Sequence, residues 1–257
     1  MPRWLYALLA TLLLAAPACA QDPSRLDLVL ARGALRVGLT GDYKPFSIVD
    51  KSAPLGMTGL DVDAAQTLAQ SLGVKLEIVQ TAWPHLMDDL LADNYDIGMG
   101  GITITLARQR TALFSTPVMR AGKTAIARCA DKDKYPTLAA IDQPGVRVAA
   151  NPGGTNESFD RANLHAATIV PFPDNATIFD DLVAGKADVM ITDGVETRLQ
   201  QKLHPELCAI NPDHPFNTSE LGYMLPRDPV WKAYVDQWLA ISTETGDRAK
   251  LVSKWLD

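Results

Sequence analysis

Histidine and cysteine are scarce in this 257-residue chain, which has four histidines and three cysteines. The histidines are scattered and have no metal-ligand spacing, so the sequence predicts no metal site. There is no Gly-x-Ser-x-Gly nucleophile elbow, and the Gly-Gly-Thr at 153–155 lacks the Gly-Lys-Ser/Thr end of a phosphate-binding loop. No cofactor is therefore expected.

An excess of positive charge is also missing. The chain has 24 Lys and Arg against 30 Asp and Glu, a net charge of −6, with the two signs mixed along the sequence. A basic face for nucleic acid and a polybasic membrane patch are both excluded. With 47% hydrophobic and 21% charged residues, the composition suits a globular protein with one large or two small cores.

Long apolar runs are absent after the first twenty residues. Arg3 precedes the apolar stretch 5–16, which is too short to span a bilayer. Ala18-Cys19-Ala20 forms an A-x-A cleavage site, so residues 1–20 are predicted to be a signal peptide and the mature chain to begin at Gln21. The alternative, a lipid anchor on Cys19, is disfavoured by Pro17 and by the lack of a leucine at position 16. We expect a periplasmic protein with no membrane association after cleavage.

Export changes how the cysteines are interpreted. Only Cys129 and Cys208 remain in the mature chain, and they face an oxidising compartment. A disulfide between them is predicted, near the first and last strands of the second half of the chain. The alternative is a pair of buried free thiols.

Strand and helix patterns alternate along the chain, which indicates α/β architecture. Strands are expected at 35–39, 75–79, 95–100, 146–150, 168–172, 189–192 and 222–225. Helices are expected at 23–32, 59–72, 83–92, 175–184, 195–204, 229–244 and 247–256, and a further helix is expected after Gly153-Gly154-Thr155. Two α/β lobes follow from the repeat of the pattern after position 120.

The lobes have no low-complexity linker between them. Segments near 120–124 and 216–221 are expected to be paired crossings that form a two-segment hinge. The first lobe would then be discontinuous, with residues 21–121 and 218–257, and the second would hold residues 122–217. A ligand cleft is expected between the lobes, at the carboxyl ends of their strands.

Several motifs resemble the periplasmic amino-acid-binding proteins over nearly the whole mature chain. They are Asp42-Tyr43-Lys44-Pro45-Phe46, Gly59-Leu60-Asp61-Val62-Asp63, Tyr95-Asp96-Ile97, Gly100-Gly101-Ile102-Thr103-Ile104-Thr105-Leu106-Ala107-Arg108 and Phe114-Ser115-Thr116-Pro117. The resemblance implies a periplasmic-binding-protein-like fold.

A narrower resemblance is to the periplasmic cyclohexadienyl dehydratases, enzymes within that superfamily. It rests on Gly41-Asp42-Tyr43-Lys44-Pro45, Trp83-Pro84, Arg128-Cys129-Ala130-Asp131, Asn151-Pro152-Gly153-Gly154-Thr155-Asn156-Glu157 and Glu196-Thr197-Arg198-Leu199-Gln200-Gln201. It implies decarboxylating dehydration of prephenate to phenylpyruvate and of L-arogenate to L-phenylalanine.

Substrate carboxylates need cationic or N–H partners. Arg108 resembles the receptor arginine that binds a ligand carboxylate through two hydrogen bonds. Thr103 is expected to contribute to binding the same carboxylate. The alternative is that Arg108 is a solvated arginine on a helix. Arg110 is the competing candidate for the carboxylate-binding role. Gly154, before an expected helix, offers open N–H groups at a positive helix end.

The remaining pocket residues are expected from the resemblance. Tyr43 and Trp83 resemble cleft aromatics that stack on the substrate ring, although a core position is the commoner place for an aromatic. Asn151 and Asn156 resemble polar groups of the dehydratase pocket, with capping of the turn as their alternative.

Two acids stand where a buried strand passes into a helix. Asp193 resembles the receptor acid that pairs with an α-amino group, and its alternative is an N-cap. Glu196 lies three residues later on the same helical face. From position alone it is a solvated acid favoured by the helix dipole. The resemblance makes it a general acid that protonates the departing hydroxyl, with its pKa raised by a dry cleft and by Asp193.

Two functions remain open from the sequence. One is an exported dehydratase, and the other is an amino-acid-binding receptor that delivers its ligand to an ABC transporter. The acid at Glu196 favours the enzyme, whereas the scaffold suits both. The preferred substrate and the oligomeric state are left open by the sequence.

Overall fold

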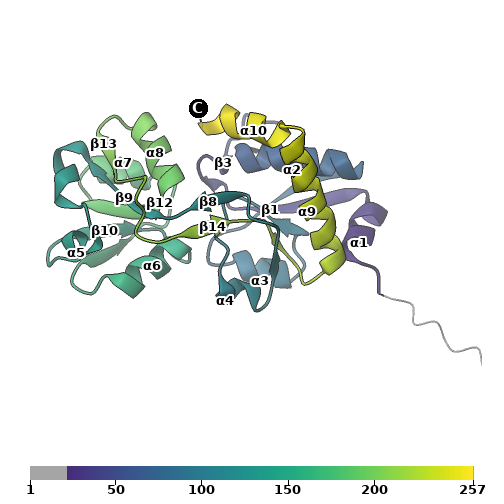
Figure 1. Cartoon of the computed structure of the whole chain (residues 1–257), viewed down its shortest axis with the longest axis horizontal. Helices are drawn as coiled ribbons and strands as arrows, with labels where there is room; N and C mark the ends of the chain where they lie inside the picture. The colour runs from purple at the N-terminus through teal and green to yellow at the C-terminus, as the bar shows by residue number, and fades with distance from the viewer. Residues whose placement is uncertain (1–21, 257) are drawn as a thin grey trace, which may run out of the picture.

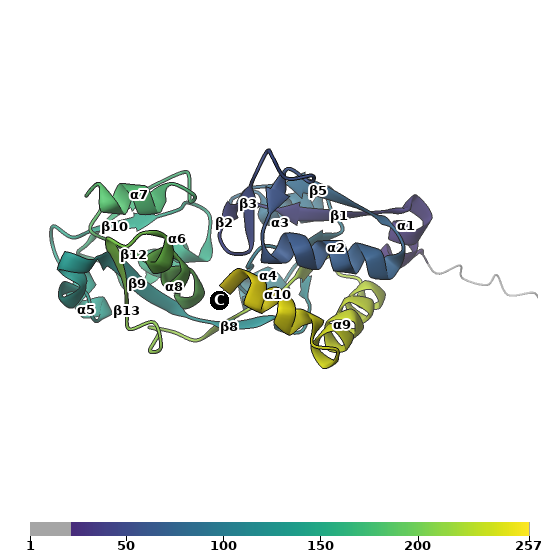
Figure 2. The same ribbon diagram turned by 90° about the horizontal axis from the view of Figure 1, so that it is seen from above.

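Two α/β lobes lie side by side in the computed structural model, which describes residues 22–256 (Figures 1 and 2). The predicted signal peptide, 1–20, lies outside the described residues. Each lobe contains one five-stranded sheet flanked by helices. The predicted fold class is confirmed.

The sheet of the first lobe has the order β5-β1-β6-β15-β7. β1 pairs in parallel with β5 and β6, while β15 pairs antiparallel with β6 and β7. The lobe contains α1 (Arg25–Arg32), β1 (Ala34–Leu39), β2 (Asp42–Tyr43), β3 (Ser47–Val49), β4 (Met57–Thr58), α2 (Leu60–Leu72), β5 (Lys75–Gln80), α3 (Leu86–Leu91), β6 (Ile97–Gly98), α4 (Leu106–Gln109), β7 (Leu113–Phe114), β15 (Met224–Leu225), α9 (Pro229–Glu244) and α10 (Asp247–Leu256).

The second sheet has the order β11-β10-β12-β9-β13. Its first three strands are parallel, and β9 runs antiparallel to both of its neighbours. The lobe contains β9 (Lys123–Arg128), the 3-10 helix η1 (Cys129–Lys134), α5 (Leu138–Ile141), β10 (Arg147–Ala150), α6 (Thr155–Asn163), β11 (Thr168–Pro171), α7 (Ile178–Val183), β12 (Val189–Asp193), α8 (Gly194–Leu203) and β13 (Leu207–Ile210).

Two strands, β8 (Met119–Ala121) and β14 (Ser219–Leu221), pair antiparallel where the chain crosses between the lobes (Figure 1). They lie within or beside the two predicted crossings. After β14 the chain returns to the first sheet through β15, so the first lobe is discontinuous. The predicted boundaries at 121/122 and 217/218 stay a prediction.

Local sequence explains where the main helices begin and end. Asp228 caps α9 by accepting hydrogen bonds from the N–H groups of Val230 and Trp231, and Pro229 occupies the first turn, where its missing N–H costs nothing. α2 ends at Gly73, whose φ of 67° is the left-handed conformation that glycine adopts without strain.

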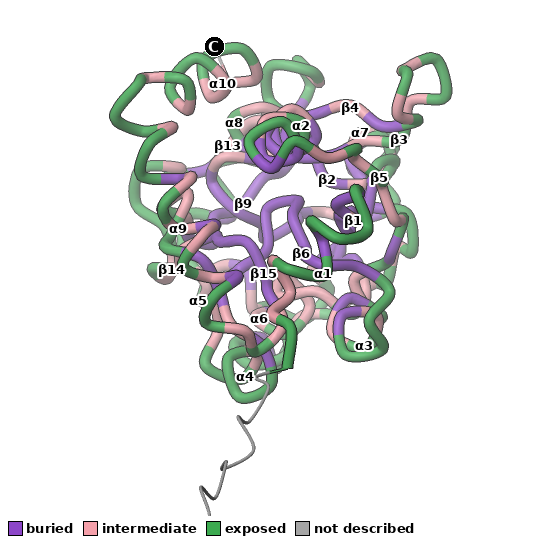
Figure 3. Tube along the Cα trace, turned by 90° about the vertical axis from the view of Figure 1, so that its right-hand side faces the viewer, coloured by how far each residue is buried: buried purple, intermediate pink, exposed green. Residues whose placement is uncertain are grey.

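Apolar burial follows the sheets (Figure 3). β1 and β9 are buried along almost their whole length, as expected for strands covered on both faces. Because the lobes have separate apolar cores, around Leu35 and Trp231 in the first and around Ile126 and Ile191 in the second, each can keep its shape when the other moves.

The structure adds elements that the sequence interpretation missed. β9 occupies 123–128, where the sequence predicted a crossing only as far as 124, and β13 was not predicted. The irregular segment 50–57 joins β3 to β4 in a small three-stranded sheet with β2. Short apolar strands beside a crossing have too little periodicity to be recognised from sequence.

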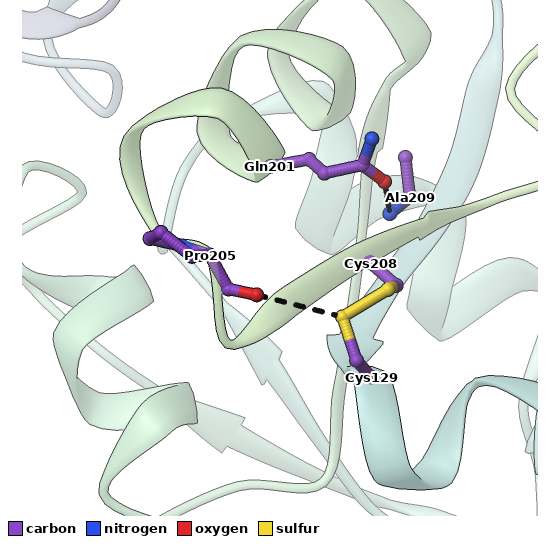
Figure 4. Close-up of a disulfide and its surroundings, with 5 residues drawn as sticks. All are labelled: Cys129, Gln201, Pro205, Cys208 and Ala209. Carbon is purple, nitrogen blue, oxygen red and sulfur yellow. Dashed lines mark hydrogen bonds between the residues drawn. A yellow bond between two sulfur atoms is a disulfide. The ribbon is translucent and has the colours of Figure 1, made fainter.

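The predicted disulfide is present between Cys129 and Cys208, whose Cα atoms are 4.8 Å apart (Figure 4). As predicted, it lies near the first and last strands of the second lobe, β9 and β13. It links the end of β9 to its direct neighbour β13. Beside it, the side-chain oxygen of Gln201 on α8 accepts a 2.8 Å hydrogen bond from the N–H of Ala209. The edge strand β13 is therefore held on both sides.

We expect a Cys129→Ser/Cys208→Ser variant to unfold more easily than the wild type. The disulfide closes a 79-residue separation, and the loss of that constraint on the unfolded chain costs at most about 4–5 kcal/mol. Chemical denaturation measures the difference. Reductant should destabilise the wild type and leave the double variant unchanged. Two alkylatable thiols in the unreduced mature protein would contradict the bond.

Candidate active site

A small pocket lies between the lobes, where strands from both sheets end at their carboxyl ends. Its lining is Tyr43, Trp83, Gly101, Thr103, Asn151, Gly154, Thr155, Asn156, Asn175 and Asp193. Seven of the eight predicted binding residues are in this list. Arg108 and the predicted catalytic Glu196 are not. Gly101, Thr155 and Asn175 were missed by the sequence interpretation.

The lobes touch across this pocket. The Tyr43 hydroxyl donates a 2.7 Å hydrogen bond to Oδ2 of Asp193, and the hydroxyls of Thr103 and Thr155 are 3.1 Å apart. The cavity that remains is about 20 Å³, enough for a single water molecule. A substrate can therefore enter only when the lobes separate.

Lys123 forms a buried ion pair with Asp193. Its Nζ lies 2.9 Å from Asp193 Oδ1, and both residues are about 2% exposed. The pairing follows from strand register, because Lys123 at the start of β9 stands opposite Asp193 at the end of β12. Both oxygens of Asp193 are therefore engaged, one by lobe 1 and one by lobe 2. Asp193 stands at the N-cap position of α8 but makes no side-chain cap.

Lys123 was not predicted from the sequence. The signal that could have revealed it is the run Thr124-Ala125-Ile126-Ala127 directly after the crossing, which marks a strand that would begin at the lysine.

A chain of hydrogen bonds leads from Lys123 to Glu196. Nζ of Lys123 donates to Oδ1 of Asn156 at 2.5 Å, and Nδ2 of Asn156 donates to the hydroxyl of Thr192 at 2.9 Å. That hydroxyl donates in turn to Oε2 of Glu196 at 2.6 Å. Asn156, predicted as a pocket residue, thus connects the cation to the acid.

Glu196 is completely buried on the first turn of α8. Its Oε1 has no hydrogen-bond partner among the described residues. Burial raises the pKa of Glu196 to about 8, and the Asp193 charge adds to the rise, while the Thr192 hydrogen bond and Lys123 oppose it. Near neutral pH the side chain is therefore mainly a neutral carboxylic acid, with a free oxygen to carry its proton.

Arg108 lies just outside the pocket. Its guanidinium donates a 2.8 Å hydrogen bond to the carbonyl of Thr103, which does line the pocket. Burial lowers the pKa of Arg108, yet an arginine remains charged. Across residues 22–256 no carboxylate forms an ion pair with it. The guanidinium is a cation still able to bind an anion.

The two predicted aromatics meet in the pocket wall. Tyr43 and Trp83 pack edge to face, with ring centroids 5.7 Å apart, and Nε1 of Trp83 donates to Oδ1 of Asp42 at 3.1 Å. Gly101 approaches them closely, because a Cβ at this position would lie 2.7 Å from the Tyr43 ring. Asp61 holds that loop by accepting from the N–H groups of Gly100 and Gly101.

The second lobe supplies the opposite wall. Gly154 is the N-cap residue of α6, and it has no side chain to cap the helix. Asn151 donates from Nδ2 to the carbonyls of Phe172 (3.1 Å) and Pro173 (3.0 Å), so it fixes the loop that carries Asn175 into the pocket.

In the part of the chain that the structure describes, no three His, Cys, Asp or Glu side chains lie close enough together to hold a metal ion. Over the same 22–256 range, none of the helices combines the length and apolar character needed to cross a membrane.

The chain is similar in sequence and structure to known proteins. The sequence profile of the bacterial extracellular solute-binding proteins, family 3, matches residues 35–257. Cyclohexadienyl dehydratase of Pseudomonas aeruginosa is 53% identical over 256 residues, which cover 99% of this chain and 95% of that protein.

Two solved structures are similar along most of the chain. The ancestral amino acid-binding protein AncCDT-1, described as a precursor of cyclohexadienyl dehydratase, is 36% identical with a TM-score of 0.85, covering 91% of this chain and all of its own. An ancestral cyclohexadienyl dehydratase, AncCDT-3, is 52% identical with a TM-score of 0.57, covering 92% and 98%. The chain belongs to the bacterial extracellular solute-binding proteins of family 3.

Proposed function

We propose that this chain is a periplasmic cyclohexadienyl dehydratase, which converts prephenate to phenylpyruvate and L-arogenate to L-phenylalanine. The observation that carries the proposal is Glu196, a fully buried acid with one oxygen that has no hydrogen-bond partner within residues 22–256. The 53% identity to a dehydratase over nearly the full chain supports the same activity. Periplasmic location is supported by the extracellular family and by the signal-like first twenty residues.

Glu196 acts as the general acid in this proposal. The proton on Oε1 passes to the ring hydroxyl, and the C–O bond breaks to release water. The ring carbon–carboxylate bond breaks in the same reaction, carbon dioxide leaves, and its electron pair completes the aromatic ring. Glu196 is left as a carboxylate and must recover one proton before the next turnover.

Thr192 keeps the proton on the productive oxygen. Because its hydroxyl donates to Oε2 of Glu196, that oxygen acts as an acceptor, and the proton of the neutral acid belongs on Oε1. Asn156 and Lys123 hold Thr192 in this orientation. These three side chains position the acid, and the acid alone transfers the proton.

The cations suit an anionic substrate. Lys123 and Asp193 neutralise each other, so Arg108 is the group proposed to bind a substrate carboxylate, beside Thr103 and the N-terminus of α6 after Gly154. Tyr43 and Trp83 would contact the ring, with Asn151 and Asn156 in the opposite wall. The role of Asp193 as partner of an amino group stays a prediction, because both its oxygens already accept hydrogen bonds.

An amino-acid-binding receptor is the second candidate. It is favoured by the similarity to AncCDT-1, which is an amino acid-binding protein. The two candidates differ in one measurement, because a receptor binds an amino acid and turns over neither cyclohexadienyl substrate.

Glu196→Gln should reduce turnover of prephenate by at least ~10²-fold. The amide keeps the shape of the side chain and cannot give up a proton in the same way. Substrate binding should change little, since one neutral group replaces another. Steady-state kinetics by the absorbance of phenylpyruvate measures the effect.

Glu244→Gln is the matched control, because Glu244 is an exposed glutamate on α9, far in sequence from the site. It should keep the wild-type rate. Equal rates for Glu196→Gln and the wild type would be compatible with the dehydratase activity but would contradict the assignment of Glu196 as the general acid.

The wild-type rate should fall as pH rises through about 8. The donor is active in its protonated form, so activity is present below the raised pKa of Glu196 and is lost above it. Burial also raises the pKa of Asp160 to about 8. Circular dichroism at each pH is therefore needed to separate loss of the donor from unfolding. A folded protein whose rate rises above pH 8 would contradict the assignment.

Arg108→Ala should weaken substrate binding by roughly 2–5 kcal/mol, or about 30-fold or more, because a desolvated carboxylate loses its charge partner. The change should appear in the KM for prephenate and arogenate alike. Arg110→Ala removes an exposed arginine two residues away and should bind normally. If Arg110→Ala is the variant that loses binding, the chosen arginine is wrong.

A further inference from the structure

One acceptor in the pocket has no hydrogen-bond donor. Asn175 follows β11, is 3% exposed and lines the pocket. Its Nδ2 donates to the backbone carbonyl of Asp42 in the other lobe at 3.1 Å, which fixes which end of the amide is which. The opposite end, Oδ1, is buried and has no partner within the described part of the chain.

A buried carbonyl oxygen without a donor is unfavourable and uncommon. The loop that carries it is held in place, because Asn151 donates to two of its carbonyls. The acceptor therefore keeps its position when the pocket is occupied. A ligand with a suitably placed donor would satisfy it.

The two substrates of the proposed function differ in donors. Prephenate carries one, the ring hydroxyl, which Glu196 is proposed to protonate. L-Arogenate carries in addition an α-ammonium group, and a charged donor makes the stronger hydrogen bond to an amide oxygen. Asp193, the acid expected to pair with an amino group, has both oxygens occupied by Tyr43 and Lys123.

Charge near Asn175 also favours a cation. Asp174 precedes it in the loop, and Asp42 contributes the carbonyl that Asn175 contacts. Burial raises the pKa of the Asp42 carboxyl, and the nearby Asp174 charge adds to the rise. Two carboxylates, those of Asp42 and Asp174, therefore lie near the Asn175 end of the pocket.

We propose that Oδ1 of Asn175 accepts a hydrogen bond from the α-ammonium group of L-arogenate, and that Asn175 allows one site to take both the amino and the keto substrate. The inference rests on the proposed function. Prephenate would leave this acceptor unpaired, so Asn175 affects specificity between the two substrates and leaves the chemistry at Glu196 unchanged.

The test is the ratio of kcat/KM for arogenate to kcat/KM for prephenate. Asn175→Leu removes the acceptor with little change in volume, and the ratio should fall about 10-fold or more. Asn175→Asp restores an acceptor and should return the ratio to the wild-type value or above it. This rescue distinguishes recognition of the ammonium from loss of the Asp42 contact, which both variants share. Asn163→Leu, on the exposed end of α6, is the matched control and should leave the ratio unchanged.

An equal loss of kcat/KM for both substrates in Asn175→Leu, which leaves the ratio unchanged, would overturn the inference. The proposed dehydratase activity would not be affected by that result. A wild type that converts prephenate and rejects arogenate would also overturn the inference. If the wild type converts neither substrate, the proposed function fails. The inference is then tested by comparing the thermal stabilisation that L-phenylalanine gives with the stabilisation that phenylpyruvate gives. Asn175→Leu should lose stabilisation by the amino acid alone, and retention of it would overturn the inference.

Discussion

The buried ion pair between Lys123 and Asp193 is the contact on which the rest of the site depends. A lysine that is 2% exposed is unfavourable unless its charge is paired and hydrogen-bonded. Asp193 supplies the charge, and Asn156 and Thr155 supply further acceptors. Because Asp193 also accepts from Tyr43 in the other lobe, one carboxylate satisfies the lysine and closes the cleft.

The same pair explains how an acid can be set inside a binding-protein scaffold. In a receptor, a carboxylate at the end of this strand would be free to hold an amino group. Here Lys123 occupies that carboxylate, and the amide and hydroxyl beyond it end on Glu196. In the proposed mechanism, the acid expected to bind an amino group instead supports the acid that donates the proton. The similarity to both an ancestral amino acid-binding protein and an ancestral dehydratase agrees with such a short step between the two functions.

Much of this arrangement could be predicted from the sequence. The apolar strands before Asn151 and Asp193, and the motif around Thr103, place their polar residues at the carboxyl ends of strands, and such ends meet at a cleft. Lys123 could not be placed in this way, because it begins an antiparallel strand directly after the crossing. Asn175 lies in a loop whose position depends on the amide of Asn151, a contact that no local pattern reveals. Strand register and the contacts that support a loop are features of tertiary structure, and they cannot be predicted from sequence periodicity.

Closure of the lobes also bears on when Glu196 carries its proton. Burial is the main cause of its raised pKa, and part of what buries this region is Tyr43, which comes from the other lobe. Separation of the lobes would admit water, and we expect the pKa of Glu196 then to fall toward that of an ordinary glutamate. After turnover the carboxylate would thus be stable in the open protein and take up a proton as the cleft closes. Substrate entry and recharging of the acid would then be parts of one movement, and the hydroxyl would meet a neutral donor only inside a dry pocket.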